Sequence, residues 1–170
     1  ADRVRGVLAG LQLQTVDEHV RDAVHHGARV LAGGRARPDL GPYFYEPTIL
    51  EGVTADAACH ADETFGPVIS IYPFRSEEQA IDLANAGDYG LNAAVYSKDG
   101  RRARSVANQI KCGTVNVNEA FSATFASIDA PMGGMRSSGM GRRQGAEGIH
   151  RYTEVQSVAT QYLLRFGPHW

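Results

Sequence analysis

Three scarcities in this 170-residue sequence narrow what the chain can be. Its two cysteines, Cys59 and Cys112, are far apart and match no metal-site spacing, so we expect reduced thiols and no bound metal. No apolar run approaches the length of a membrane span, and residues 1–6 lack the pattern of a secretory signal, which favours a cytoplasmic protein. The net charge is only -2, with Lys and Arg scattered among acidic residues, so we expect no nucleic-acid partner and no membrane partner.

What remains is the composition of an ordinary folded protein. The sequence is 43% hydrophobic and 21% charged, and its length is sufficient to bury a core in one globular domain. We find no internal repeat, low-complexity tract or interdomain linker.

Hydrophobic periodicity predicts alternating strands and helices. After an irregular lead-in over residues 1–10, apolar residues at helical spacing predict a helix that begins near Leu13 and stops at Gly27. Ser76 to Gln79 has the pattern of a capping box, which predicts a second helix ending at Gly87. The expected strands are 28–32, 45–50, 68–74, 91–96 and 114–118, and a third helix with a basic face precedes the last of them. This alternation predicts an α/β fold with a parallel βαβ sheet and right-handed crossovers.

The end of the chain has a different pattern. Residues 119–148 predict a loop rich in glycine and serine, with one helical turn near Ala146. Residues 152–161 contain no proline or glycine and favour a strand, and residues 163–170 form a tail. Because residues 152–161 follow a loop rather than a crossover helix, we expect a strand that has no partner strand within its own chain and pairs with another chain.

Chemistry is most concentrated between Ala61 and Pro67. The carboxylate of Glu63 and the ring of Phe65 come just before a Gly-Pro break that leads directly into the expected strand 68–74. This places both side chains at the mouth of a strand, where ligands of α/β sheets commonly bind. On these seven residues alone, an exposed acid and a core phenylalanine are the favoured interpretation, and a ligand site is the alternative.

Three blocks of sequence resemble the aldehyde dehydrogenase superfamily and occur in its order. They are ETFGPV at residues 63–68, GTVNVN at residues 113–118 and PMGGMRSSGMGR at residues 131–142. The resemblance runs from about Leu11 to Gln161, covers only the C-terminal part of such an enzyme, and is closest to succinate-semialdehyde dehydrogenases of actinobacteria. It implies that residues 1–150 form an incomplete aldehyde dehydrogenase catalytic domain and residues 151–170 a C-terminal oligomerisation strand and tail.

The resemblance also implies roles for individual residues. Glu63 matches the acid that holds the nicotinamide ribose hydroxyls, and Phe65 matches the aromatic residue beside the nicotinamide ring. Both roles suit the side chains, since a carboxylate accepts hydrogen bonds from vicinal hydroxyls and an aromatic face can support the ring. Met132 stands where the family has a phenylalanine that lines the aldehyde tunnel, and Arg136 stands where lysine is common. A methionine that merely fills a core gap is the alternative for Met132.

Polar residues of the loop before Met132 are further substrate-binding candidates, because they offer hydroxyls or an amide: Asn118, Ser122, Thr124 and Ser127. Loop serines that simply contact solvent are the alternative for each. The glycine-rich stretch 139–145 has neither the spacing nor the preceding strand of a phosphate loop, so we reject that function. The adjacent pair His25 and His26 does not predict a metal site, since neighbouring side chains on a helix diverge.

We assign no catalytic residue in this chain. In the family a cysteine thiolate attacks the aldehyde, the thiohemiacetal gives hydride to nicotinamide, and water hydrolyses the thioester. Neither Cys59 nor Cys112 has the glycine-rich context of that nucleophile, and we find no match to the general-base glutamate or the dinucleotide-binding domain.

The resemblance therefore implies part of an NAD(P)-dependent aldehyde dehydrogenase, a homo-oligomer with succinate semialdehyde as the candidate substrate. We expect the isolated chain to be inactive and to bind neither NAD nor NADP appreciably. The alternative is a truncated, non-catalytic remnant that serves as an oligomerisation or interaction module.

Overall fold

The computed structural model describes residues 2–162, and side chains from residue 9 onward. The chain forms two compact units, a first unit from Ala1 to Asp88 and a second unit from Tyr89 to Trp170. No proline- or glycine-rich linker in the sequence marks this division. The α/β class predicted above is confirmed, because each unit combines helices with short strands.

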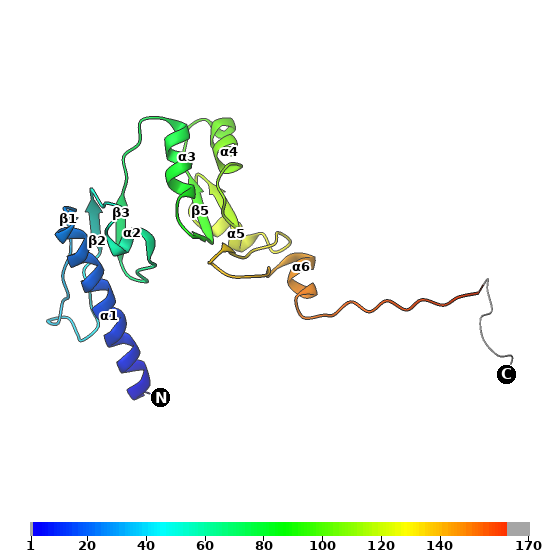
Figure 1. The fold of residues 1–170 in the computed structure, drawn as a ribbon, viewed down its shortest axis with the longest axis horizontal. Helices are drawn as coiled ribbons and strands as arrows, with labels where there is room; N and C mark the ends of the chain where they lie inside the picture. Colours follow the sequence, from blue (N-terminus) through cyan, green and yellow to red (C-terminus); the bar gives the residue numbers. More distant parts are fainter. Residues whose placement is uncertain (1, 163–170) are drawn as a thin grey trace. The chain divides into compact units, whose positions relative to one another are not determined.

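A long helix and a three-stranded sheet form most of the first unit (Figure 1). Its elements are α1 (Asp2–His25), β1 (Arg29–Ala32), β2 (Thr48–Glu51), α2 (Ala58–Ala61), β3 (Val68–Ile71) and α3 (Glu77–Asn85). The strand order is β1-β2-β3, with β1 antiparallel to β2 and β2 parallel to β3. The parallel arrangement predicted from the sequence therefore holds for β2 and β3, but β1 runs the other way.

Helix α1 differs from the prediction at its start. It begins at Asp2, so the expectation of an irregular lead-in over residues 1–10 was wrong. Nothing in that stretch breaks a helix: its glycines only weaken helical propensity, and no proline interrupts it. The other end agrees with the sequence, because Gly27 follows the helix with φ +93°, a conformation that few other residues adopt readily.

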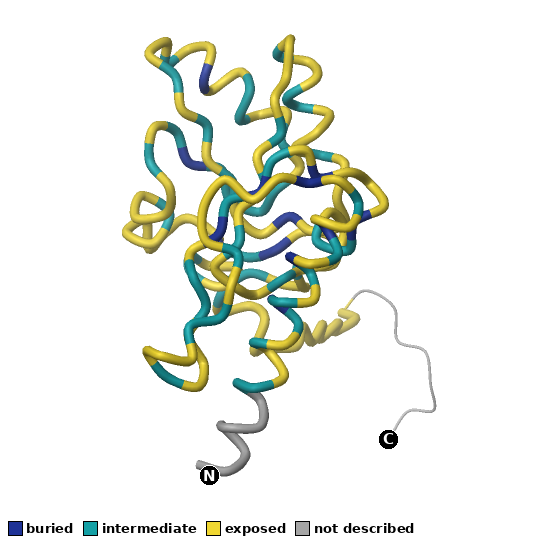
Figure 2. The backbone as a smooth tube through the Cα atoms, turned by 90° about the vertical axis from the view of Figure 1, so that its left-hand side faces the viewer, coloured by how far each residue is buried: buried dark blue, intermediate teal, exposed yellow. Residues whose placement is uncertain are grey.

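The core of the first unit lies between α1, α2 and one face of the sheet. Its buried apolar residues are Val20, Ala23, Ala28, Leu50, Val53 and Ala57. Burial alternates along β2, where Thr48 and Leu50 are buried and the two residues between and after them are partly exposed. The dark blue segments of Figure 2 mark the buried positions.

The capping box of α3 is confirmed. The Ser76 hydroxyl accepts a hydrogen bond from the backbone N–H of Gln79 at 3.2 Å. The Gln79 side chain reaches back and accepts from the backbone N–H of Arg75 at 2.7 Å. The N–H of Gln79 is one that the helix leaves unpaired, and that of Arg75 lies just before the cap residue Ser76.

The second unit contains two separate two-stranded sheets. Its elements are β4 (Tyr89–Gly90), β5 (Asn92–Val95), α4 (Gly100–Ala107), β6 (Thr114–Val117), α5 (Ser122–Ala126), β7 (Met135–Arg136) and α6 (Gly145–His150). Strands β5 and β6 are parallel and joined through α4, whereas β4 and β7 are antiparallel. The predicted strand–helix–strand series and the turn near Ala146 are confirmed here, and α5 is an element that the sequence pattern did not reveal.

Glycine is required where two stretches of the second unit meet. A Cβ on Gly113 would overlap the backbone carbonyl of Gly133, so no larger residue fits without moving one of the two backbones. This contact brings the start of β6 against the PMGG block.

Residues 153–162 belong to no strand in the part of the chain that the structure describes. They follow α6 in an extended path (Figure 1) and are exposed throughout. The predicted C-terminal strand and its role in oligomerisation therefore remain predictions, and the predicted tail at 163–170 lies outside the described residues.

Candidate functional site

The loop that carries Glu63 and Phe65 is held in place by α1. The Gln12 side-chain amide donates to the backbone carbonyls of Thr64 and Phe65, at 2.8 and 3.1 Å. Nδ1 of His19 hydrogen-bonds to the Thr64 hydroxyl at 3.0 Å. Phe65 itself has φ +46°, in the left-handed region that a phenylalanine seldom adopts.

The loop presents both candidate side chains to the outside. Glu63 is exposed, and Phe65 is 73% exposed, so the interpretation of Phe65 as a core residue was wrong for this chain. A strained, exposed aromatic residue on an anchored loop is the kind of feature that marks a ligand site more often than a core.

Backbone contacts then lead the loop into the sheet. The carbonyl of Pro67 accepts from the N–H of Thr48 at 2.7 Å, which sets the loop beside the first residue of β2. A Cβ on Gly66 would collide with Val16 of α1, so glycine permits this close approach. The predicted position at a strand mouth is confirmed, but it is the amino end of the parallel pair β2 and β3, not the carboxyl end that α/β ligands usually occupy.

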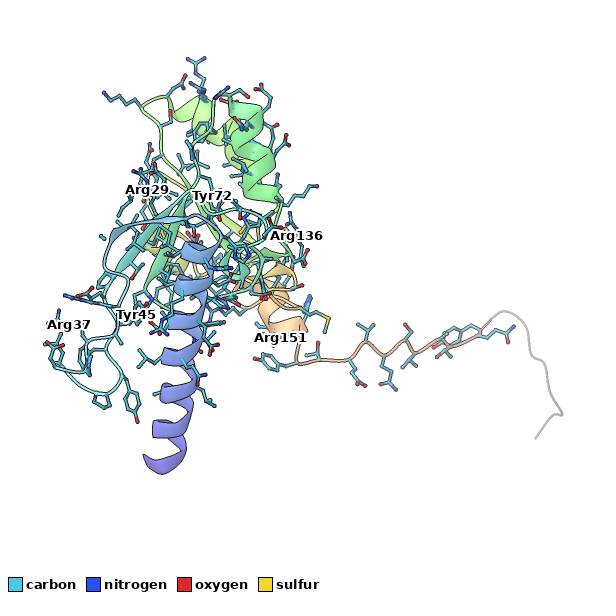
Figure 3. The ribbon with its side chains drawn as sticks, turned by 60° about the vertical axis from the view of Figure 1, so that its left-hand side comes forward. Arg29, Arg37, Tyr45, Tyr72, Arg136 and Arg151 are labelled. Atoms are coloured by element: carbon cyan, nitrogen blue, oxygen red, sulfur yellow. The ribbon has the colours of Figure 1, made fainter. Side chains whose placement is uncertain are left out.

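A hollow of about 340 Å³ adjoins this loop. Its aromatic lining comes from Tyr43, Phe44, Tyr45 and Phe65, and residues of α1 complete it. The Tyr45 hydroxyl, labelled in Figure 3, donates to Asp17 at 3.3 Å. Burial, followed by the negative charge of Asp17, raises the pKa of Tyr45 to about 12, so this hydroxyl remains protonated in neutral solution.

The substrate-binding candidates all lie in the second unit, beginning at the end of β6. Asn118 has φ +58° and donates its backbone N–H to Val95 at 2.8 Å, while its side-chain oxygen accepts from the N–H of Ser97 at 2.8 Å. The side chain therefore joins the ends of β5 and β6, and Asn118 is exposed there.

Glu119 organises the residues that follow. Its carboxylate accepts from the backbone N–H groups of Phe121 (2.9 Å), Ser122 (2.7 Å) and Ala123 (2.9 Å), and from the Ser122 hydroxyl at 2.6 Å. The hydrogen bond from that hydroxyl, then those from the three N–H groups, lower the pKa of Glu119 to about 2. The glutamate thus caps the five-residue helix α5.

Thr124 belongs to a polar network centred on the buried Asn116. The Thr124 hydroxyl donates to the Asn116 oxygen at 2.6 Å. The Asn116 amide donates to Asn92 of β5 at 2.9 Å and to the carbonyl of Ala120 at 3.1 Å. This network ties α5 to both strands of the parallel pair.

The last two candidates, Ser127 and Met132, each contact a neighbouring residue of the second unit. The Ser127 hydroxyl donates to the carbonyl of Ala123 at 2.7 Å, one turn earlier in α5. Met132 is 3% exposed, and its sulfur accepts from the Arg143 guanidinium at 3.3 Å. The backbone of Met132 also pairs with that of Arg143. Because the Met132 side chain is buried, it fills the interior of this unit.

The structure therefore collects the candidates into two groups, with Glu63 and Phe65 in one unit and the substrate set in the other. Sequence reasoning missed Glu119 and Asn116. Glu119 matches no capping pattern in the sequence, since it lies two residues before Phe121, the residue that directly precedes α5. Asn116 had no signal, because its partners lie up to 24 residues away.

The two thiols are free, as expected. Burial raises the pKa of the Cys59 thiol, and the charge of Asp22 adds to this effect. Cys112 lies between α4 and β6 and is only partly exposed. Among the side chains of residues 9–162, which are those the structure describes, no three His, Cys, Asp or Glu groups are arranged to hold a metal ion. Over that same range, no helix is long and apolar enough to cross a membrane.

Comparison with known sequences identifies the family of the chain. A sequence model of the aldehyde dehydrogenase family matches residues 7–158. The chain belongs to the aldehyde dehydrogenase family. Aldehyde dehydrogenases among the curated proteins include one of Mycolicibacterium smegmatis, provisionally named succinate-semialdehyde dehydrogenase (NADP(+)), which is 53% identical over 92% of this chain.

Solved aldehyde dehydrogenases share the fold. The betaine aldehyde dehydrogenase of Staphylococcus aureus, solved with NAD+, matches 83% of this chain and 28% of its own, with 37% identity and a TM-score of 0.76. The succinate-semialdehyde dehydrogenase of Burkholderia pseudomallei matches 84% of this chain and 29% of its own, with 37% identity and a TM-score of 0.75. This aldehyde dehydrogenase chain spans about 30% of the length of the Mycolicibacterium relative.

Proposed function

We propose that this chain is part of an NAD(P)-dependent aldehyde dehydrogenase that oxidises an aldehyde to a carboxylic acid. The observation that carries the proposal is the Glu63–Phe65 loop, whose two side chains point outward from an anchored, strained backbone. Because the chain spans about 30% of a curated relative, we place the nucleophilic cysteine, the general base and the dinucleotide-binding domain in other parts of the protein.

The residues of the loop fit a nicotinamide nucleotide. The exposed Glu63 carboxylate can accept hydrogen bonds from both hydroxyls of a ribose, and the exposed Phe65 ring offers a flat apolar face. When bound, the nicotinamide ring supplies a hydride acceptor. Glu63 would fix the position of the sugar, and Phe65 would support the ring and keep water from one of its faces. Two contacts to one half of a dinucleotide give weak affinity, so we expect little binding to this chain alone.

Succinate semialdehyde is the candidate substrate within this proposal. The support is that the Mycolicibacterium relative is provisionally named a succinate-semialdehyde dehydrogenase and that the rat mitochondrial succinate-semialdehyde dehydrogenase is 43% identical over 86% of this chain. We place the aldehyde near residues 118–132, where Asn118 directly follows β6 and Ser122 and Thr124 lie on α5. Arg136 and Met132 distinguish this chain from the more common residues of the family at those positions.

A Glu63→Ala substitution in the complete enzyme tests the cofactor role. We expect hydride transfer to slow by about tenfold or more, because the ribose loses the hydrogen bonds that orient it, while KM for NAD(P) changes less. Asp62→Ala is the matched control, since it removes an adjacent exposed carboxylate. Equal rates for the two variants in single-turnover experiments would contradict the role of Glu63.

A second candidate role concerns residues 151–170, which we propose as an oligomerisation segment of a cytoplasmic homo-oligomer. Val155 is 97% exposed and Val158 is 83% exposed, and an extended apolar segment of this kind can add to the sheet edge of another chain. Light scattering at micromolar concentration tests it: we expect a dimer or larger species, which Val155→Pro should dissociate. A monomer of 18.3 kDa would contradict the proposal and also the alternative of a non-catalytic interaction module.

A further inference from the structure

The hydroxyl groups of the substrate set share one property: each donates its proton inside the protein. The Ser122 hydroxyl donates to Glu119 at 2.6 Å, that of Thr124 to Asn116 at 2.6 Å, and that of Ser127 to a backbone carbonyl at 2.7 Å. A hydroxyl has one proton and two lone pairs, so each of these oxygens can still accept a hydrogen bond but has no proton left to donate.

The negative charge of Glu119, like these hydroxyl oxygens, favours a ligand that donates hydrogen bonds. Glu119 is held ionised by its four hydrogen bonds, with a pKa of about 2, and therefore stays negative at any pH used for an assay. None of the ion pairs among the side chains described, those of residues 9–162, joins Glu119 to a Lys or Arg. Among the side chains of residues 118–127, the amide N–H₂ of Asn118 is the remaining donor, because its oxygen accepts from the N–H of Ser97.

We propose that Glu119 is a specificity-determining residue that makes residues 118–127 a hydrogen-bond-accepting surface. This surface takes an uncharged or donor-bearing part of the substrate and disfavours a carboxylate. The inference rests on the proposed function, because it assumes that the aldehyde binds beside this segment. If succinate semialdehyde is the substrate, its carboxylate contacts residues other than these hydroxyls.

The first test compares two aldehydes of similar length in the complete enzyme. Succinate semialdehyde carries a carboxylate, and 4-hydroxybutanal carries a neutral hydroxyl donor in its place. Glu119→Gln removes the charge but keeps an acceptor oxygen, so we expect the ratio of kcat/KM for the anion over the alcohol to rise roughly threefold to tenfold, mainly through KM. Asp129→Asn is the control: it removes an exposed carboxylate from the same unit and should leave the ratio unchanged. An unchanged ratio in Glu119→Gln, or a fall, would overturn the inference.

Two further variants separate specificity from folding. Ser122→Ala and Thr124→Val remove acceptor oxygens, and we expect each to raise KM for 4-hydroxybutanal with little effect on KM for succinate semialdehyde. A larger rise for succinate semialdehyde would show that the hydroxyls bind its carboxylate, which the inference denies. A loss of structure would instead lower kcat for both aldehydes alike.

Binding to the 170-residue chain separates this inference from the proposed function. If the wild-type enzyme oxidises neither aldehyde, the proposed function fails, and ligand titrations followed by NMR still test the surface. We expect the amide signals of residues 118–127 to shift with succinamide, which is neutral and rich in donors, and not with succinate. Shifts with succinate, or with neither compound, would overturn the inference.

Discussion

The two units of this chain are stabilised by different means. The first unit buries aliphatic side chains between α1, α2 and the sheet, with Leu50 completely inaccessible at its centre. The second unit buries only Ala103 and Met132 among its described apolar side chains, together with the polar Asn116. Its order comes from the hydrogen bonds of Asn116 and Glu119 and from backbone contacts at glycine. The difference shows that one chain can combine a unit with an apolar core and a unit whose interior depends on matched polar groups.

The units also differ in charge. The first unit has seven arginines and no lysine against fourteen acidic residues, whereas the second has ten basic residues against five acidic ones. The impression of scattered charge holds only for the whole chain and disappears when the chain is divided after Asp88. The cofactor candidates thus lie in an acidic unit and the substrate candidates in a basic one, so the acceptor surface at Glu119 is a local exception to its surroundings.

Leu50→Ala should produce the largest change, because it removes a fully buried side chain from the core of the first unit. We expect the free energy of unfolding of this unit to fall by about 2–5 kcal/mol. Hydrogen exchange on the intact chain should show faster exchange up to Asp88 and unchanged protection in β5 and β6. Ile69→Ala, at a position that is 63% exposed, is the control and should lower the free energy of unfolding much less. Equal costs would mean that the first unit lacks the core described here.

Asn116→Ala tests the second unit, whose interior depends on a polar network rather than on an apolar core. It leaves the Thr124 hydroxyl without its acceptor and removes one of the two hydrogen bonds that the Asn92 side-chain oxygen accepts, so we expect a loss of about 1–3 kcal/mol confined to the second unit. Hydrogen exchange should accelerate in α5 while the first unit stays protected. Asn108→Ala, at an exposed position, should have little effect. A loss no greater than that of the control would show that the polar network does not stabilise this unit.

Ser76→Ala should have a smaller effect. It deletes the hydroxyl that accepts from Gln79, and caps of this kind are worth about 1 kcal/mol. We expect fraying of the first turn of α3, seen as faster exchange at residues 77–80, while the core around Leu50 keeps its protection. Ser76→Asp should restore the cap, and failure to do so would mean that the hydroxyl has another role.

Opposite responses to pH complete the comparison. Glu119 has a pKa lowered from 4.5 to about 2, so its contribution to stability is present above pH 4.5 and is lost as the pH falls toward 2. Asp99, which caps α4 through the N–H groups of Arg102 and Arg101, also has a lowered pKa. We therefore expect acid to loosen α4 and α5 of the second unit. NMR of Glu119→Gln should show a flatter response of α5 over that window, and an unchanged response would contradict the assignment.

Alkali should act on the first unit. Tyr45 has a pKa raised from 10.0 to about 12, so its contribution is complete below pH 10 and is lost as the pH rises toward 12. Burial also raises the pKa of Tyr72. Tyr45→Phe removes the titrating group, and absorbance-detected alkaline unfolding should then begin at higher pH. The same onset in both proteins would show that Tyr45 does not control it.

Much of the architecture was predictable because it depends on neighbouring residues. The spacing of Val16, Val20 and Ala23 predicted α1, and the Ser76 capping box predicted α3. The start of α1 was missed because a weak helical pattern near a chain end has no clear boundary signal. Strand β1 was predicted, but its antiparallel direction was not, since a short strand has no sequence feature that specifies the direction of its partner.

The sequence by itself indicated the family, the order of the main strands and helices, and the end of α1 at Gly27, but not α5, β4 or β7. Tertiary structure decided that Phe65 is exposed on a loop held by Gln12, 53 residues away, and that Asn116 and Glu119 accept hydrogen bonds from the hydroxyls of Thr124 and Ser122. The reason is that periodicity and turn chemistry act over a few residues along the chain. Burial and hydrogen bonding depend instead on which distant segments the fold brings within about 3 Å.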